Sequence, residues 1–494
     1  MMPRMRAIVS APTAKAPHGR RSHMLVGMPA TLSVQTTAIP GLLLLDLPLH
    51  ADARGWLKEN WQRAKMTALG LPDFGPVQHT LARNASAGVT RGFHAEPWDK
   101  FISVAAGRIF GAWVDLREGS SFGSVVTAEI GPDKAVFVPR GVGNSYQTLE
   151  DDTVYSYLVN DHWSAEALSE YTYLNLADED VAVPWPIPLG EAIISAADAA
   201  HPRLAGVTPM RGRRTVIIGA DGQLGMSLRT LLPDARALTR QELDLGDPEA
   251  VRRFDWRGVG TIINAGAFTG VDVAETPQGR TDCWRVNVSG VGALVAKARE
   301  LRARLVHISS DYVFDGTQPE HLEDEPFSPL GVYGQTKAAG DALVATLPEH
   351  YIVRTSWVVG AGRNFVRTMA DLAARGISPA VVDDQIGRLT FSDDLAAAIL
   401  HLLGGGAPFG TYNMTNSGPS QSWADLAARV FELCGRDPGQ VSRISTELYG
   451  AGKDLAPRPR HSTLALDKLI ATGFNPASAD QRLVAYLRET DDRT

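Results

Sequence analysis

The feature that most constrains the fold of this chain is a change in its hydrophobic pattern near residue 214. Beyond it, short apolar runs typical of buried strands alternate with segments of helical period. The strand-like runs are TVIIG at 215–219, GTIINAG at 260–266, RLVHISS at 304–310 and HYIVRTS at 350–356. Parallel strands need long crossover connections, so this alternation predicts a parallel sheet covered by helices. We therefore expect an α/β Rossmann domain over 214–494, with a small C-terminal substrate subdomain.

The part of the chain before this change has a different pattern. Short β-branched and aromatic runs, cut by glycine and proline, continue to about residue 185 and predict an all-β domain over 38–189. Residues 190–213 are rich in proline, glycine and alanine and are predicted to be a linker. Residues 1–37 contain arginine, alanine and proline without the apolar segment of a secretory signal, which predicts a disordered basic tail.

Length and composition limit the possible functions. A chain of 494 residues exceeds the size of a single hydrophobic core, and it has no apolar run long enough to span a bilayer. Its net charge of -7 argues against nucleic-acid binding, although a local arginine cluster can still hold a nucleotide. Its 2 cysteines form no CxxC pair, which argues against a disulfide framework or a structural zinc site and favours the cytoplasm. We expect a homo-oligomer, a dimer in the simplest case.

A glycine-rich turn follows the first predicted strand of the second domain. The sequence GADGQLG at 219–225 opens a helix, where exposed N–H groups and the helix dipole favour a pyrophosphate. No acidic residue follows the second strand, and Arg240 stands there instead, which favours the 2′-phosphate of NADPH over NADH. The expected cofactor contacts are Gly219, Gly222, Gln223, Leu224, Gly225, Arg240, Asp244, Leu245, Ala265 and Gly266, together with Tyr333 and Lys337.

Tyr333 and Lys337 are four residues apart and therefore share one helix face. A fixed cation beside a phenol favours the phenolate, so we expect Lys337 to bring the pKa of Tyr333 towards neutrality. Ser310 follows a predicted strand and adds a hydroxyl at the edge where an open sheet binds ligands. The three residues together can protonate an alkoxide as a hydride arrives.

Ordered motifs in the second half, among them IIGADGQLG, HISSDYVFDG, VYGQTKAAGD, VRTSWV and RPRHSTL, resemble those of dTDP-4-dehydrorhamnose reductases. These enzymes belong to the extended short-chain dehydrogenase/reductase group. The resemblance covers about 215–490 and implies Ser310, Tyr333 and Lys337 as the catalytic trio, with NAD(P)H at the glycine turn. It also implies that Arg354 and Trp357 lie near the sugar nucleotide.

Two arginines and a histidine stand out in the first domain. Arg54 and Arg91 could clamp a diphosphate by bidentate hydrogen bonds, and His94 could remove a proton beside the carbonyl of a keto-sugar. The motifs DARGWLKENW, GVTRGFH, DKFISVAAGRIFGAWVDLREGSSFG and FVPRGVGNSYQTLEDDTVYSY resemble those of dTDP-4-dehydrorhamnose 3,5-epimerases over about 38–188. These fold as a cupin-type jelly roll, a double-stranded β-helix.

This second resemblance implies His94 as the base, Asp178 as its orienting carboxylate, Lys100 as the stabiliser of the enolate oxygen and Tyr157 as the acid. Substrate contacts are expected from Arg54, Glu59, Arg91 and Asn144. Asn144 stands where the family usually has a second histidine, and it cannot titrate near neutral pH. No metal is expected, because His94 and Glu96 are the only clustered pair of metal-ligand types near the motif.

Together the two halves predict a bifunctional enzyme acting on a dTDP-linked keto-sugar, with epimerisation at C3 and C5 before reduction at C4. Three alternatives stay open. The reductase could act on another nucleotide-linked keto-sugar, the first half could only bind or epimerise a single carbon, or the chain could be a non-catalytic regulatory subunit.

Overall fold

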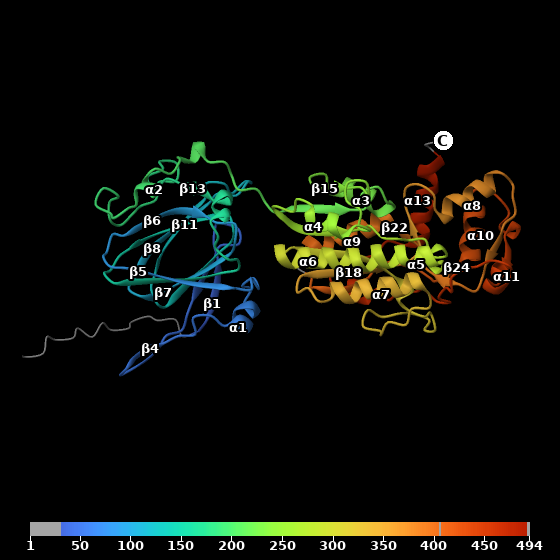
Figure 1. The fold of residues 1–494 in the computed structure, drawn as a ribbon, viewed down its shortest axis with the longest axis horizontal. Coiled ribbons are helices and arrows are strands. Elements are labelled where there is room, and N and C mark those ends of the chain that lie inside the picture. Colours follow the sequence, from blue (N-terminus) through green and yellow to red (C-terminus); the bar gives the residue numbers. More distant parts are fainter. Residues whose placement is uncertain (1–30, 405–406, 492–494) are drawn as a thin grey trace, which may run out of the picture. The chain divides into compact units, whose positions relative to one another are not determined.

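The structure is a computed structural model that describes residues 31–404 and 407–491. Most of the predicted tail, residues 1–30, lies outside these described residues. The chain divides into two compact units, Met1–Gly212 and Arg213–Thr494 (Figure 1). Each unit has hydrophobic clusters of its own, so each is described by itself.

The first unit contains two antiparallel sheets. In one sheet the strands lie in the order β1 (Ser33–Thr36), β2 (Leu43–Asp46), β10 (Lys134–Val138), β7 (Lys100–Ala106), β12 (Thr153–Val159) and β5 (Gln78–Asn84). In the other the order is β13 (Thr172–Leu174), β6 (Thr90–Ala95), β11 (Val142–Thr148), β8 (Ile109–Asp115) and β9 (Val125–Ile130). A hairpin of β3 (His50–Asp52) and β4 (Gly55–Leu57) precedes the short helix α1 (Arg63–Ala68).

Alternate side chains of the two sheets meet in one core. Ile102 and Tyr155 from the first sheet pack with Trp113 and Tyr146 from the second, and all four are nearly inaccessible to solvent. An all-β domain was expected here, and the period-2 alternation of its strands is what fills this core. The prediction of a disordered tail over 1–37 was wrong for residues 33–36. These residues form β1, which pairs with β2, and Val34 packs against a second hydrophobic cluster.

The segment 190–213, predicted to be a linker, is instead part of the first unit as far as Gly212. Ile193 forms a bridge with Val89, and Met210 forms one with Arg117. Ile194 and Met210 belong to the same hydrophobic cluster as the sheet residue Phe93, and the helix α2 (Ala196–Ala199) lies against β6. The apolar residues scattered along this proline- and glycine-rich stretch therefore bury themselves against the sheet, which a free linker would leave exposed.

The second unit is built on a parallel sheet, as expected. Its strands lie in the order β15 (Arg236–Leu238), β14 (Arg214–Ile218), β16 (Val259–Asn264), β17 (Arg304–Ser310), β18 (His350–Thr355) and β23 (Gly410–Asn413). The crossover helices are α3 (Gln223–Leu231), α4 (Pro248–Arg253), α5 (Pro277–Trp284), α6 (Val291–Leu301), α7 (Val332–Val344) and α9 (Ser392–Gly404).

Helices cover both faces of this sheet (Figure 1). Ile218 and Ile262 point to the layer formed by α4, α6 and α7, whereas their neighbours Ile217 and Ile263 point to the layer formed by α3 and α9. Both faces being buried explains why the strands appear in the sequence as continuous apolar runs. The result is a Rossmann-like sheet that is covered by helices on both faces. The carboxyl ends of its parallel strands lie at one edge.

The C-terminal part of this unit forms a third core around α8 and α10. Its elements are β19 (Val358–Val359), α8 (Phe365–Ala374), β20 (Ala380–Val382), β21 (Ile386–Gly387), β22 (Thr390–Phe391), β24 (Gln421–Ser422), α10 (Trp423–Leu433), β25 (Ser442–Ile444), α11 (Thr446–Gly450), α12 (Asp467–Ile470) and α13 (Ala479–Asp491). Among the residues that the structure describes, no helix combines the length and apolar character that a bilayer crossing requires.

Candidate active sites

The glycine turn connects β14 to α3 and requires glycine for steric reasons. Gly219 has a φ of +78°, and a Cβ there would lie 2.7 Å from the backbone of Gly266 on the neighbouring strand end. A Cβ on Gly225 would lie 2.1 Å from the carbonyl oxygen of Gly219. The turn is therefore tight, and it leaves the N-terminus of α3 without a side chain that would cover its amide groups.

A cavity of about 790 Å³ opens at this edge of the sheet. It brings together nearly all of the residues expected to contact the cofactor, namely Gly219, Gly222, Gln223, Leu224, Arg240, Asp244, Leu245, Ala265, Gly266, Tyr333 and Lys337. Gly225 lies behind them in the turn. The buried Oε1 of Gln223 has no hydrogen-bond partner among the described residues, and Arg240 is exposed beside Asp244 at 3.6 Å. This lining fits a dinucleotide, with the pyrophosphate at the turn and a cation near the adenosine ribose.

The residues expected to perform reduction line the same cavity. Ser310 ends β17, while Tyr333 and Lys337 lie one turn apart on α7. The side chains of Tyr333 and Ser310 are hydrogen-bonded. Lys337 Nζ donates to the carbonyl oxygen of Ile308 at 2.6 Å. The carboxyl end of a central strand and the first turn of a helix thus place three reactive groups beside the glycine turn.

The pKa of Tyr333 differs from expectation. Burial raises it above its ordinary value, and the neighbouring Asp311 carboxylate raises it further. Burial also lowers the pKa of Lys337 to about 8. Desolvation penalises both charged forms, so the pKa of Tyr333 does not fall as the spacing suggested.

Trp357 and Arg354, both expected near the sugar nucleotide, have different positions. Trp357 lines the cavity in a left-handed backbone conformation, φ +47°, and stacks on Trp423 with ring centroids 3.7 Å apart. Arg354 is 3% exposed and donates to Asp341 at 3.1 Å and to the carbonyl oxygen of Glu323 at 2.9 Å. Arg354 is not among the residues that line this cavity. Where a substrate contact was expected, the structure instead shows an ion pair between Arg354 on β18 and Asp341 on α7.

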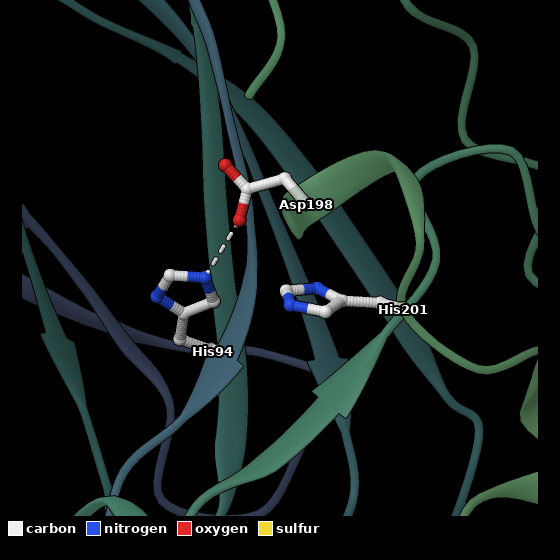
Figure 2. Close-up of side chains that lie close together, drawn as sticks. All are labelled: His94, Asp198 and His201. Atoms are coloured by element: carbon white, nitrogen blue, oxygen red, sulfur yellow. Dashed lines mark hydrogen bonds and ion pairs between the residues drawn. The ribbon is translucent and has the colours of Figure 1, made fainter. Parts of the chain in front are cut away.

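In the first unit, His94 lies on β6 and its Nε2 is 2.9 Å from Oδ1 of Asp198 (Figure 2). Asp198 comes from α2, and its second oxygen accepts a hydrogen bond from Ser195 at 2.8 Å. Burial alone would raise the pKa of Asp198, but the hydrogen bonds from His94 and Ser195 lower it to about 2. A carboxylate that stays ionised beside an imidazole orients the ring and fixes its tautomer.

Asp178 was expected in this position, and that expectation was wrong. Its carboxylate accepts hydrogen bonds from the backbone N–H groups of Asp180, Val181 and Leu204, which stabilises a turn. Asp198 was missed because residues 190–213 were taken for a linker. The available signal was the spacing of Ser195 and Asp198, in which the serine caps α2 by accepting from the Asp198 amide.

Lys100 and Tyr157, which were also expected to act in epimerisation, lie close to each other, whereas Asn144 lies elsewhere. Lys100 Nζ is 2.8 Å from Oε2 of Glu96 and 4.8 Å from the ring centroid of Tyr157. Tyr157 and Glu96 line a cavity of about 390 Å³ whose wall includes Trp163. Asn144 is not in this lining.

The amide of Asn144 has two partners within the protein. Its Oδ1 accepts from the indole of Trp113 at 2.9 Å, and its Nδ2 donates to the phenol of Tyr155 at 3.2 Å. Both partners are deeply buried core residues. Asn144, expected to bind substrate, therefore links side chains of the core.

The expected substrate contacts Arg54 and Glu59 lie on or next to the β3–β4 hairpin and line neither cavity. Arg54 pairs with Asp52 at 2.6 Å, and Glu59 pairs with Lys65 at 2.5 Å. Arg91 is an exposed residue of β6 and lies 3.5 Å from Oδ1 of Asn84.

A second histidine unexpectedly adjoins His94. In the described part of the chain, ligand atoms of His94, Asp198 and His201 lie within 4.8 Å of one another (Figure 2). The expectation of no metal had assumed that no such histidine was present. The direct hydrogen bond between His94 and Asp198 is nevertheless the geometry of an acid–base pair, because a metal between these atoms would have to separate them.

Comparisons with known proteins agree with the division of the chain into two units. Residues 213–491 match the family model described as RmlD substrate binding domain, and residues 36–206 match that of dTDP-4-dehydrorhamnose 3,5-epimerase. The chain is 47% identical to a protein RmlC homolog of Streptococcus pyogenes over 35% of this chain and 89% of that protein. It is 37% identical to a dTDP-4-dehydrorhamnose reductase of Mycolicibacterium smegmatis over 53% of this chain and 81% of that protein.

A solved dTDP-4-dehydrorhamnose reductase of Bacillus anthracis, in complex with NADP, is similar to the second unit. It shares 33% identity and a TM-score of 0.51, over 56% of this chain and 98% of the other.

Proposed function

The chain belongs to the RmlD substrate binding domain family over 213–491 and to the dTDP-4-dehydrorhamnose 3,5-epimerase family over 36–206, and we propose from this that it performs both reactions of the two families. The first unit epimerises dTDP-4-keto-6-deoxyglucose at C3 and C5. The second unit reduces the C4 ketone of the product with NADPH. The two steps in this order form dTDP-L-rhamnose.

One observation carries the reductase assignment: a single cavity is lined by the glycine turn and by Ser310, Tyr333 and Lys337. The bound NADPH supplies the hydride. Tyr333 donates its phenolic proton to the oxygen at C4, and Ser310 holds that oxygen by a hydrogen bond. Lys337 contributes a cation that favours the alkoxide and the phenolate over their neutral forms. Trp357 forms a flat apolar wall for the sugar nucleotide.

For the cofactor we propose contacts from the residues of the turn and its surroundings. The N-terminus of α3 binds the pyrophosphate, since its amides are uncovered. Arg240 binds the 2′-phosphate, because it is exposed at the cavity and its partner Asp244 is 3.6 Å away.

The epimerase assignment rests on the pairing of His94 with Asp198. His94 removes the acidic proton next to the ketone, and Asp198 stabilises the imidazolium that results. Lys100 stabilises the enolate oxygen, and Tyr157 returns a proton from the opposite face. The position of the Lys100 ammonium over the Tyr157 ring supports the idea that both groups serve one sugar.

Finer structural assignments belong to the same proposal. The two packed antiparallel sheets of the first unit support a cupin-type jelly roll, and the parallel sheet of the second supports the extended short-chain dehydrogenase/reductase type. Cys283 and Cys434 form no disulfide within the described part of the chain, which supports a cytoplasmic enzyme.

We also propose a homodimer. Trp56 and Leu57 of the β3–β4 hairpin are 42% and 71% exposed, and such apolar side chains are commonly covered by a second subunit. Arg54 and Glu59 lie on or next to this hairpin, so a second subunit packed against the hairpin would lie close to both. Light scattering of the full chain tests this, and a monomer at micromolar concentration would contradict it.

A single incubation tests both activities. The full chain is mixed with dTDP-4-keto-6-deoxyglucose and NADPH in heavy water, and NMR locates deuterium in the product. We expect deuterium at C3 and C5 and a reduced C4. Reduction without deuterium would contradict the epimerase assignment, and deuterium without NADPH oxidation would contradict the reductase assignment.

A further inference from the structure

The carboxyl group of Asp311 adjoins the reducing residues but has no part in the function described so far. Asp311 follows Ser310 directly, is 2% exposed and lines the cavity of the second unit. The Ser310 hydroxyl donates to Oδ1 of the Asp311 carboxylate at 2.9 Å. Because Ser310 is also hydrogen-bonded to Tyr333, the three side chains form a continuous chain from the phenol to the carboxyl group.

The surroundings of Asp311 favour its protonated form. Burial raises its pKa to about 6, although the hydroxyls of Ser462 and Ser310 and the charge of His321 act in the opposite direction. The other titratable groups facing it are Tyr312 and Tyr333, and the Asp311 carboxylate raises the pKa of each. Its Oδ2 is buried without a hydrogen-bond partner among the described residues, which further disfavours a carboxylate.

Reduction of a ketone leaves Tyr333 in need of a proton. The hydride carries an electron pair to C4, the C4 oxygen takes the phenolic proton, and a phenolate is left in a buried site. That phenolate is strongly basic, since burial raises the pKa of Tyr333. Lys337 donates to the carbonyl oxygen of Ile308 at 2.6 Å, which directs one of its protons away from the phenol.

We propose that Asp311 supplies the replacement proton to Tyr333 through the hydroxyl of Ser310. When Asp311 is protonated, its O–H donates to Ser310 Oγ and the Ser310 proton turns to the Tyr333 oxygen. The carboxyl O–H bond then breaks as Ser310 Oγ gains that proton, and the original Ser310 proton passes to the Tyr333 oxygen. The step leaves the Asp311 carboxylate and neutral Ser310 and Tyr333, and Asp311 regains its proton from water after product leaves the cavity. No electrons move in this relay. The inference rests on the proposed reductase function.

The pH dependence follows from the protonated fraction of Asp311. This fraction falls as pH rises through about 6, so the contribution of the relay is largest in acid and disappears in base. Above that range the phenolate must take its proton more slowly from water entering the cavity.

The test compares wild type with Asp311→Asn, which keeps the size and hydrogen-bonding capacity of the side chain but has no transferable carboxyl proton. We expect the steady-state turnover rate of NADPH oxidation, which requires Tyr333 to be re-protonated in every cycle, to fall about 10- to 100-fold at a pH of about 5. The difference should shrink to less than about twofold at a pH of about 8. Asp315→Asn is the matched control, since Asp315 lies in the same loop and bonds the exposed Thr317, and it should leave the profile unchanged.

A second measurement needs neither substrate nor cofactor. Infrared difference spectra of wild type minus Asp311→Asn should contain a protonated-carboxyl band that disappears with a midpoint at a pH of about 6. A rate ratio independent of pH, or no such band, would overturn the relay. An inactive wild type would instead overturn the reductase function itself, so the two failures are distinguishable.

Discussion

At the scale of single residues, the chemistry of the first unit depends on a contact between distant positions. His94 and Asp198 are 104 residues apart in the chain, yet their side chains form one hydrogen-bonded pair. Asp178, which is also buried, accepts only backbone hydrogen bonds in its own turn and from Leu204. The two aspartates therefore differ in their contacts, and only Asp198 is placed for the chemistry that we propose for the first unit.

We predict that Asp198→Asn lowers the rate of deuterium incorporation at C3 and C5 by about 10²- to 10⁴-fold, because the imidazolium of His94 loses its counter-charge. NMR of the sugar in heavy water measures this rate. Asp178→Asn is the matched control: it should lower the melting temperature through its weakened turn while keeping most of the exchange rate. Equal loss of exchange in both variants would contradict the assignment of Asp198.

A second prediction at this scale concerns Tyr333. Tyr333→Phe should reduce NADPH oxidation by at least about 10²-fold, since the proton donor is lost, while NADPH binding measured by fluorescence changes by less than about threefold. Tyr449→Phe serves as the control, because Tyr449 is 42% exposed and lies outside the cavity lining. A variant with ordinary turnover would remove Tyr333 from the mechanism.

At the scale of elements, the turn between β14 and α3 shows that similar glycines have different requirements. A Cβ on Gly225 would meet the Gly219 carbonyl oxygen at 2.1 Å, which forces the helix away from the strand. A Cβ on Gly222 would lie 3.3 Å from the same atom, with no positive φ to strain it. The close approach of α3 to the turn therefore depends on Gly225 much more than on Gly222.

We predict that Gly225→Ala weakens NADPH binding by at least about tenfold, because displacement of α3 removes its amides from the pyrophosphate. Gly222→Ala should change the affinity by a few fold at most. Fluorescence titration of both variants with NADPH gives the comparison, and circular dichroism reports whether the fold is kept. Equal affinities would argue against the turn as the pyrophosphate site.

At the scale of the whole molecule, the boundary between the units falls at Gly212 and Arg213. The stretch after residue 189 places Asp198 and His201 beside His94, and it covers the second sheet with Ile194 and Met210. Residues 190–212, whose composition suggested a linker, are thus an integral part of the epimerase unit.

We predict that a fragment of residues 31–212 folds and exchanges deuterium at a rate within about threefold of the full chain. A fragment ending at 189 should lose exchange and be less stable by at least about 3 kcal/mol, since it lacks the catalytic aspartate and several buried apolar side chains. Urea unfolding and NMR exchange of the two fragments measure both effects. Retained exchange in the shorter fragment would contradict the role of Asp198.

Much of this architecture was determined by the sequence alone. The parallel sheet and the glycine turn follow from patterns within a few neighbouring residues, namely strand and helix periodicity and turn chemistry. The spacing of Tyr333 and Lys337 places both on one helix face, and the resemblance of the ordered motifs to a reductase family implied the trio with Ser310. Such features are encoded locally, so a single sequence reveals them.

Only the tertiary structure decided which side chains meet. Asp198 became the partner of His94 because α2 docks on β6, and Arg354 was withdrawn from the cavity by its ion pair with the buried Asp341. The pKa of Tyr333 rises instead of falling because burial and the neighbouring Asp311 carboxylate, which the spacing along α7 does not encode, disfavour the phenolate. Contacts between distant segments and the desolvation they cause depend on how whole elements pack, and that is why the sequence left them open.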